Sequence, residues 1–286
     1  MIPSVEASDP QPCLEARDAS VSQGGCEILR RVSARIPPGR VVAVLGANGA
    51  GKSTLLRVLA GELSPSSGRV DLEGRDLTSW SRLELARRRA VMRARPLPNF
   101  PLTVEGLVAL GRHPHRRSPN FDARCIRETM AATEVEGLAG RRVSSLSTGE
   151  LQRVQLARAL TQIWGRPGAD PKPPRWLLLD EPTANLDLQH AIAMLELVRR
   201  ICAQGVGIAM VVHDLNLALR FADELVLLLD GAVLTTGPPS VLFDRPQLLV
   251  EAFGLDAELI HHPRGGWPVV LPCGRALPSN DERIHP

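Results

Sequence analysis

A glycine-rich run early in the chain has the spacing of a phosphate-binding loop. The stretch from Gly46 to Ser53 fits the pattern G-x-x-x-x-G-K-[ST] without a gap. Glycines lack a Cβ atom and tolerate positive φ, so successive backbone N–H groups can point at one phosphate. Lys52 is expected to reach the β- and γ-phosphates of a nucleotide, and the Ser53 hydroxyl can ligate Mg²⁺. The predicted nucleotide-binding residues are Gly46, Ala47, Asn48, Gly49, Ala50, Gly51, Lys52, Ser53 and Thr54.

Two carboxylates and a histidine follow apolar runs that are predicted to be strands. Asp180 and Glu181 come at the end of one such run, and His213 comes after another. The carboxyl ends of parallel strands form the rim at which α/β sheets bind ligands. An acidic residue beside a phosphate loop can hold Mg²⁺, and its neighbour can orient or deprotonate an attacking water. Such residues are also common in ordinary turns, so the functional interpretation depends on the loop at Gly46.

The stretch Ser147-Thr-Gly-Glu150 is predicted to begin a helix. Ser147 and Glu150 have the S-x-x-E spacing of a capping box, and an apolar run follows them. A well-capped helix, stabilised by about 1 kcal/mol, is sufficient to explain these residues. The same geometry presents free N–H groups at a helix N-terminus, which favours anion binding. The candidate residues of this stretch are Ser147, Thr148, Gly149 and Glu150.

The elements that must position these residues alternate between strands and helices. The unbroken apolar run Val41–Leu45 predicts a strand buried on both faces, which leads into the glycine-rich loop. Two earlier strands are expected on either side of a turn at Gly24. The segment from about Met92 to Trp164 is predicted to be a mostly helical insertion in a βαβ-type core. Later strands are expected at 176–181, 207–212 and 224–229, with helices at 188–203 and 214–222.

Composition excludes several classes of protein. The formal net charge of +3 over 286 residues is too weak to indicate a nucleic-acid partner. No stretch approaches the roughly 18 to 20 apolar residues of a membrane span, and the N-terminus lacks a signal-peptide pattern. The five cysteines are odd in number and have no C-x-x-C spacing, so neither a disulfide framework nor a zinc site is predicted. We therefore expect a cytosolic protein, or one held at a membrane only through a partner.

Taken together, five motifs resemble those of the ATPase subunits of ABC transporters. The resemblance covers roughly residues 14–237 and implies an α/β fold: a P-loop NTPase (RecA-like) core with an N-terminal antiparallel β subdomain and an inserted α-helical subdomain. It divides the chain into a flexible leader at 1–12, an ABC ATPase domain at 13–240 with the helical subdomain at about 93–165, and a C-terminal extension at 241–286 that packs on the core. The motifs are the loop at 46–54, Leu-Ser-Thr-Gly-Glu at 146–150, the run at 177–183, Asn-Leu-Asp at 185–187, and His213.

The resemblance also implies a head-to-tail homodimer with two molecules of ATP, and Mg²⁺, at its interface. Each nucleotide would lie between the phosphate loop of one subunit and the stretch Ser147-Thr148-Gly149 of the other. The implied roles are general base for Glu181, Mg²⁺ ligation for Ser53 and Asp180, sensing of the γ-phosphate for His213, and a contact across the dimer for Asp187.

Within this family the chain resembles the ATPases of hemin importers. The resemblance implies two integral membrane permease subunits as partners, a periplasmic binding protein acting indirectly, and no direct contact with cargo or nucleic acid. It implies a peripheral position on the cytoplasmic side of the inner membrane. The alternatives are a ferric-siderophore or cobalamin importer, a soluble ABC protein that does not transport, and a hydrolysis-impaired subunit. The segments that carry the hemin resemblance are 100–105, 110–112, the proline-rich insert before Arg175, 213–216 and 262–272.

Three positions depart from the family pattern. The glutamine expected after the strand at 90–92 falls on Ala94, which we expect to weaken hydrolysis or coupling while leaving ATP binding intact. Thr148 stands where glycine is usual, and a modest effect is expected. The aromatic residue that stacks on adenine falls near Val21, and the chain contains no tyrosine. An apolar contact without a stacked ring predicts weak selectivity between ATP and GTP.

Overall fold

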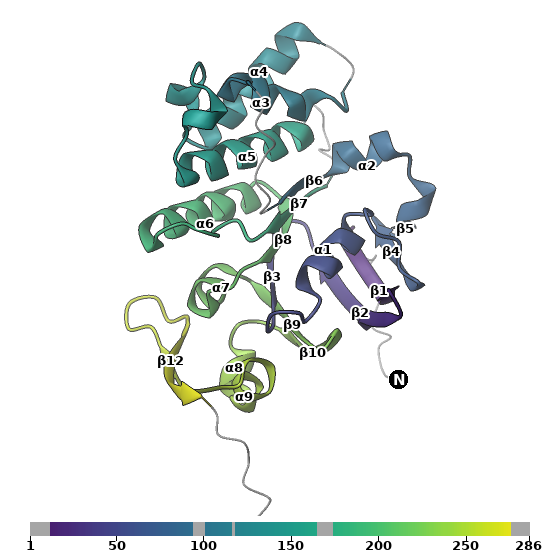
Figure 1. Cartoon of the computed structure of the whole chain (residues 1–286), viewed down its shortest axis with the longest axis vertical. Coiled ribbons are helices and arrows are strands. Elements are labelled where there is room, and N and C mark those ends of the chain that lie inside the picture. The colour runs from purple at the N-terminus through teal and green to yellow at the C-terminus, as the bar shows by residue number, and fades with distance from the viewer. Residues whose placement is uncertain (1–11, 94–100, 116–117, 165–173, 276–286) are drawn as a thin grey trace, which may run out of the picture.

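A six-stranded sheet forms the centre of the chain, for which the computed structural model describes residues 12–93, 101–115, 118–164 and 174–275 (Figure 1). The strand order is β10-β9-β3-β8-β7-β6. Neighbouring strands pair in parallel, except that β10 is antiparallel to β9. The strands are β3 (Val41–Leu45), β6 (Arg89–Met92), β7 (Arg175–Asp180), β8 (Val206–Val211), β9 (Glu224–Leu229) and β10 (Ala232–Gly237).

Helices cover both faces of this sheet, which explains why β3 is apolar at every position. Side chains of a strand point alternately to its two faces. Val41 and Ala43 pack into one core with helices α5, α6 and α7, whereas Val42 and Val44 pack into another with helix α1. A strand with a core on each side buries each of its residues. The helices are α1 (Lys52–Leu59), α5 (Thr148–Ile163), α6 (Leu188–Cys202) and α7 (Leu215–Phe221).

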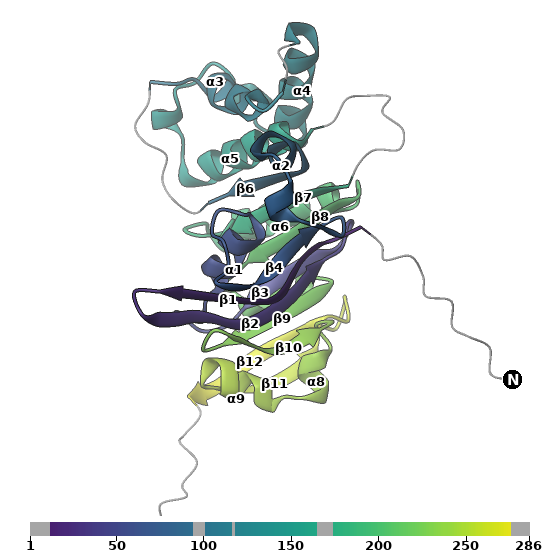
Figure 2. The ribbon, with the colours of Figure 1, turned by 90° about the vertical axis from the view of Figure 1, so that its right-hand side faces the viewer.

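A second, antiparallel sheet has the strand order β2-β1-β4-β5 and packs against α1 (Figure 2). Its first two strands join at a turn where Gly24 and Gly25 have φ of 60° and 81°, a conformation that glycine adopts without strain. This sheet is the predicted antiparallel β subdomain. Its strands and the helices after it are β1 (Leu14–Gln23), β2 (Cys26–Ile36), β4 (Ser67–Leu72), β5 (Arg75–Asp76), the 3₁₀ turn η1 (Leu77–Ser79) and α2 (Arg82–Arg88).

A helical lobe is inserted between β6 and β7 and has a small core of its own (Figure 1). Helix α5 belongs to both cores, since Val154 and Ala157 pack in the lobe while Leu156 and Leu160 pack against the sheet. The predicted α/β core with an antiparallel β subdomain and a helical insertion is therefore confirmed. The other elements of the lobe are α3 (Val104–Ala109), η2 (Leu110–Arg112), α4 (Pro119–Ala132), η3 (Glu136–Leu138) and η4 (Val143–Ser145).

The C-terminal elements pack on the same core through buried Leu248, Leu249 and Val270. The side chain of Asn216 on α7 donates to the Val270 carbonyl at 3.1 Å and accepts from the Val270 N–H at 2.7 Å, so it pairs with the strand like a neighbouring backbone. These elements are α8 (Val241–Asp244), α9 (Gln247–Phe253) and the hairpin of β11 (Leu255–His261) with β12 (Pro268–Arg275). Within the described ranges, no helix has the length and apolar character needed to span a bilayer.

Candidate nucleotide-binding site

Three adjacent parallel strands bring the predicted site residues to one edge of the central sheet. The phosphate loop follows β3, His213 comes two residues after β8, and Asp180 ends β7. Val211 of β8 is paired with Val44 on one side and with Asp180 on the other. Residues that follow parallel neighbours in register must lie at the same edge. The structure thus joins three motifs that are distant in the sequence.

The phosphate loop has the backbone that only glycine accommodates at two positions. Gly46 has a φ of 146°, and a Cβ atom there would collide with the carbonyl oxygen of Leu228 on β9. Gly51 has a φ of 96°, and its Cβ would lie 2.6 Å from a methyl carbon of Leu29. Helix α1 begins directly after Gly51 without a side-chain cap. Its first N–H groups are therefore left to bind an anion, as a nucleotide phosphate requires.

The Lys52 side chain is folded over this loop. Its ammonium donates to the carbonyl oxygens of Gly46 at 2.9 Å and Ala47 at 2.8 Å, and the residue is only 7% exposed. Burial lowers the pKa of Lys52, while the carboxylates of Glu181 and Asp180 act in the opposite direction. The cation is thus held at the loop by neutral carbonyls alone, and a phosphate would be a stronger partner.

Ser53 and Asp180 form a pair of oxygen ligands beside the lysine. The Ser53 hydroxyl donates to Oδ1 of Asp180 at 3.0 Å. Burial raises the pKa of Asp180, the Ser53 hydroxyl lowers it, and the neighbouring Glu181 carboxylate raises it further. Mg²⁺ binds through one or two carboxylates together with substrate phosphates, and a divalent cation would relieve the repulsion between the two carboxylates. These residues therefore fit Mg²⁺.

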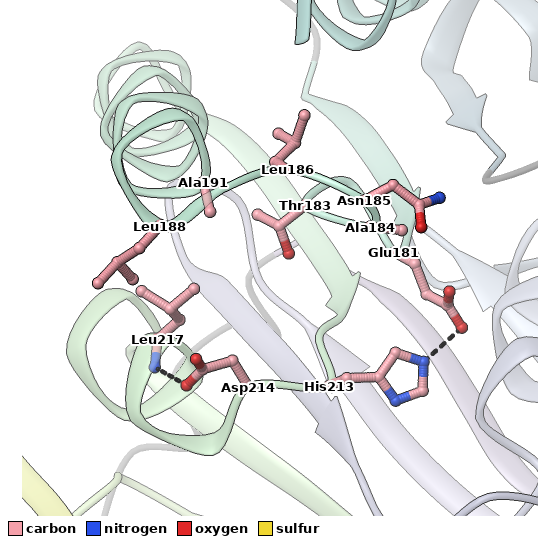
Figure 3. A pocket seen from close by; sticks show the side chains of 10 residues that line it. All are labelled: Glu181, Thr183, Ala184, Asn185, Leu186, Leu188, Ala191, His213, Asp214 and Leu217. Atoms are coloured by element: carbon pink, nitrogen blue, oxygen red, sulfur yellow. Dashed lines mark hydrogen bonds and ion pairs between the residues drawn. The ribbon is translucent and has the colours of Figure 1, made fainter. Parts of the chain in front are cut away.

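Glu181 faces His213 across the end of the sheet (Figure 3). Its Oε1 lies 2.6 Å from Nε2 of the imidazole, and its N–H donates to the Val211 carbonyl at 3.1 Å. Glu181 has a φ of 53°, which is uncommon for a residue other than glycine. The pair borders a cleft of about 470 Å³ that extends between the starts of α6 and α7. A carboxylate held by an imidazole is equipped to accept a proton from water.

Ser147 caps α5 in the predicted way. Its hydroxyl accepts from the Glu150 N–H at 3.3 Å, and the Glu150 carboxylate accepts from the Ser147 N–H at 2.8 Å and from Arg141 at 3.0 Å. Both Ser147 and Thr148 are exposed. No hydrogen bond or ion pair joins this stretch to the phosphate loop in the described part of the chain. The helix end is therefore presented outward from its own subunit.

Asp187 has a partner that sequence reasoning missed. It caps α6, accepting from the His190 N–H at 2.9 Å, and both its oxygens lie 2.8 Å from Nδ1 of the same residue. His190 is also the neighbour of Gly149, where an added Cβ would lie 3.4 Å from the imidazole. The S-x-x-E and D-x-x-H spacings could each have indicated a capped helix, but only packing brings the two helix starts together.

The expectations for Val21 and Ala94 have other outcomes. Val21 is 2% exposed and packs in the core between the antiparallel sheet and α1, so its side chain offers no surface to a nucleotide base. Side chains alternate along β1, and packing has turned this one inward. We therefore correct the expectation of an apolar contact there. Ala94 lies outside the described residues.

Comparisons with known proteins agree with this geometry. Residues 29–184 match a family model described as ABC transporter. A Hemin import ATP-binding protein HmuV of Gloeobacter violaceus is 44% identical over 276 residues, covering 95% of this chain and 99% of the relative. One of the same name from Bordetella avium is 42% identical, covering 88% and 95%.

Solved structures show the same architecture. An ATP-binding subunit of an ABC transporter superposes with a TM-score of 0.70 and 26% identity, covering 82% of this chain and 94% of that one. A dimeric bacterial ABC transporter cassette superposes with a TM-score of 0.66 and 25% identity, covering 79% and 98%.

Replacing Asp180 by asparagine tests the electrostatic cost of this site. Because burial raises the pKa of Asp180 above its ordinary value of 3.8, the folded chain binds the proton more tightly than the unfolded chain. The ionised carboxylate therefore opposes folding above the folded-state pKa, and this effect disappears as the pH falls toward 3.8. Without nucleotide or Mg²⁺, we expect Asp180→Asn to raise the unfolding temperature at pH 8, and to raise it less as the pH is lowered.

The control for this measurement is Asp223→Asn. The Asp223 carboxylate accepts from the Val41 N–H at 2.8 Å and pairs with Arg199 at 2.7 Å, so its loss should lower the unfolding temperature. An unfolding temperature of Asp180→Asn equal to or below that of the unsubstituted protein would contradict the prediction.

Proposed function

The chain belongs to the ABC transporter family of ATP-binding proteins, and on that basis we propose that it is the ATP-hydrolysing subunit of an importer whose cargo is hemin. One observation carries the hydrolytic part: the Ser53–Asp180 pair and the Glu181–His213 pair lie at the ends of adjacent strands beside Lys52. The cargo is proposed from relatives named as hemin import proteins that align over almost their whole length. They favour hemin over a siderophore or cobalamin.

Some of these residues would bind the nucleotide and Mg²⁺, and others would take part in proton transfer. The N–H groups at the start of α1 and the Lys52 ammonium would hold the phosphate chain, exchanging the lysine's carbonyl partners for phosphate oxygens. Ser53 and Asp180 would hold Mg²⁺, which neutralises charge on the phosphates when bound. Glu181 would accept the proton of the attacking water, and His213 would hold that carboxylate in place and sense the γ-phosphate.

The remaining candidates act at an interface in this proposal. Ser147, Thr148 and Gly149 are presented outward at the N-terminus of α5, where they can meet a nucleotide bound to a second copy. A solved cassette that resembles this chain is described as dimeric. Asp187 would contact the second copy while bonded to His190. We further propose that this homodimer acts with two membrane permease subunits at the cytoplasmic face of the inner membrane.

Glu181→Gln tests the chemical step. The amide keeps the shape of the side chain but cannot accept the proton, so ATP turnover should fall by about 10²- to 10⁴-fold. Binding of ATP, measured by equilibrium titration, should change little. Glu251→Gln on α9 is a matched control, because Glu251 is exposed and does not line the cleft that Glu181 and His213 border. Retention of more than a tenth of the turnover by Glu181→Gln would contradict the assignment.

Ser147→Arg tests the interface, and Ser81→Arg is its control. Both serines cap a helix in the same way, with Ser81 paired to Glu84, so both changes should cost about 1 kcal/mol of stability. In a Glu181→Gln background with ATP and Mg²⁺, sedimentation should show a dimer. We expect Ser147→Arg to abolish the dimer, Ser81→Arg to preserve it, and monomers of both to bind ATP. If Ser147→Arg abolished ATP binding by the monomer, the stretch would belong to its own subunit's site.

Transport by the assembled complex tests the cargo. The chain would be purified with its permease, incorporated into liposomes and supplied with ATP and the binding protein. We expect uptake of hemin that the Glu181→Gln variant does not support, and no comparable uptake of a ferric siderophore or of cobalamin. Uptake of either of these without hemin would replace the proposed cargo while leaving the ATPase assignment in place.

A further inference from the structure

A second pocket lies at the opposite end of the central sheet from the phosphate loop. It has a volume of about 300 Å³ and is bordered by Arg175, which begins β7, and by Arg88, which ends α2 just before β6. Because β6 and β7 pair in parallel with Arg89 opposite Trp176, both arginines stand at the amino-terminal ends of their strands. The nucleotide-binding residues stand at the carboxyl ends. The two pockets are therefore separate.

The guanidinium groups of Arg175 and Arg88 lack part of the hydrogen bonding that their charge requires. The side chain of Arg175 makes no hydrogen bond or ion pair with any other described residue, although its backbone pairs with Val206 in the sheet. Burial lowers the pKa of Arg175, and the charge of the nearby Arg88 lowers it further. Nη1 of Arg88 is buried and forms an ion pair with the Glu73 carboxylate at 3.6 Å, but it has no hydrogen-bond partner among the described residues. Two guanidinium groups are thus held close together without full compensation, which is unfavourable unless an anion joins them.

Apart from Glu73, whose carboxylate forms an ion pair with Arg88 at 3.6 Å, the charged groups around the pocket do not neutralise these arginines. Arg87 donates from Nε to the neutral carbonyl of Pro114 at 2.8 Å. Glu84 is the one carboxylate among the lining residues, and its oxygen accepts from the Ser81 N–H at 2.9 Å. His115 also lines the pocket, with Nε2 lying 2.7 Å from the Gln162 carbonyl. The pocket is therefore cationic as a whole.

Two tryptophans give the pocket an apolar part. Trp80 lines it with the Arg88 guanidinium 5.8 Å from its ring centre. Trp164 lines it from the end of the helical lobe, where Nε1 donates to Glu128 at 2.7 Å. Indoles beside guanidinium groups suit a ligand that combines a flat ring with a negative charge. The planar guanidinium fork matches the geometry of carboxylate and phosphate.

We propose that this pocket binds a small organic anion in which a phosphate or carboxylate is attached to a flat ring, with Arg175 and Arg88 holding the anionic group. Its walls come from both parts of the chain: α2 and β7 belong to the core, whereas His115 and Trp164 belong to the lobe. The two parts already meet here, where the side-chain amide Nε2 of Gln162 donates to the carbonyls of Ala86 at 2.8 Å and Arg89 at 2.9 Å. A bound anion would contact residues of both parts and so stabilise their junction.

The test is titration of the protein with phenyl phosphate and, separately, with benzoate, followed by calorimetry. The nucleotide site is first saturated with ADP and Mg²⁺, so that the phosphate loop cannot take the probe. We expect saturable binding of at least one probe and an affinity about tenfold or more lower in Arg175→Gln. Arg82→Gln is the matched control, because Arg82 is exposed on α2, the helix that Arg88 ends, and does not line the pocket. It should leave the affinity unchanged.

Further variants keep the proposal testable. Arg88→Gln should weaken binding in the same way and replaces Arg175→Gln if that protein does not fold. Binding of phenyl phosphate alone would identify a phosphate ligand, and binding of benzoate alone a carboxylate. The proposal is overturned if neither probe binds, or if folded Arg175→Gln and Arg88→Gln bind as tightly as the unsubstituted protein.

Discussion

Parallel pairing of β3, β8 and β7 is the constraint on which the rest of this structure depends. It brings an ammonium group, two carboxylates and an imidazole to one edge of a sheet, although the chain separates them widely. Partly buried charges are unfavourable without partners, and those within the chain are incomplete. Lys52 has only carbonyl oxygens, and Asp180 has only a hydroxyl for a hydrogen bond. Phosphate and a divalent cation would supply what is missing, so the composition of this edge suits ATP bound together with Mg²⁺.

Helix α5 connects this edge of the fold to the helical lobe. One side of the helix packs in the lobe through Val154 and Ala157, and another packs against the sheet through Leu156 and Leu160. Close-packed cores shift as units rather than deform continuously. A change in the angle of the lobe therefore moves the capped start of α5 together with it. In the proposed complex, this coupling would let a membrane partner bound to the lobe influence the residues presented to a second copy.

The two ends of the sheet hold their cations in different ways. At the phosphate edge, Lys52 has the carboxylates of Asp180 and Glu181 nearby, so cation and anion sites are combined. At the other end, Arg88 and Arg175 repel one another, and Glu73 is too distant for a hydrogen bond to Arg88. The end of α5 lies beside this second pocket through Trp164. One helix thus extends from the outward-facing serine to the junction of core and lobe.

Sequence alone determined the features whose hydrogen bonds join residues a few positions apart. The phosphate loop and the capping box at Ser147 are of this kind, as is the alternation of strands and helices, because local geometry and hydrophobic periodicity decide them. Tertiary structure decided the pairs that are distant along the chain: Ser53 with Asp180 is separated by 127 positions, and Glu181 with His213 by 32. It also decided that Val21 faces the core, and that the Arg175 side chain has no hydrogen bond or ion pair with another described residue. Strand order and packing set these outcomes, and neither is encoded in any contiguous stretch of residues.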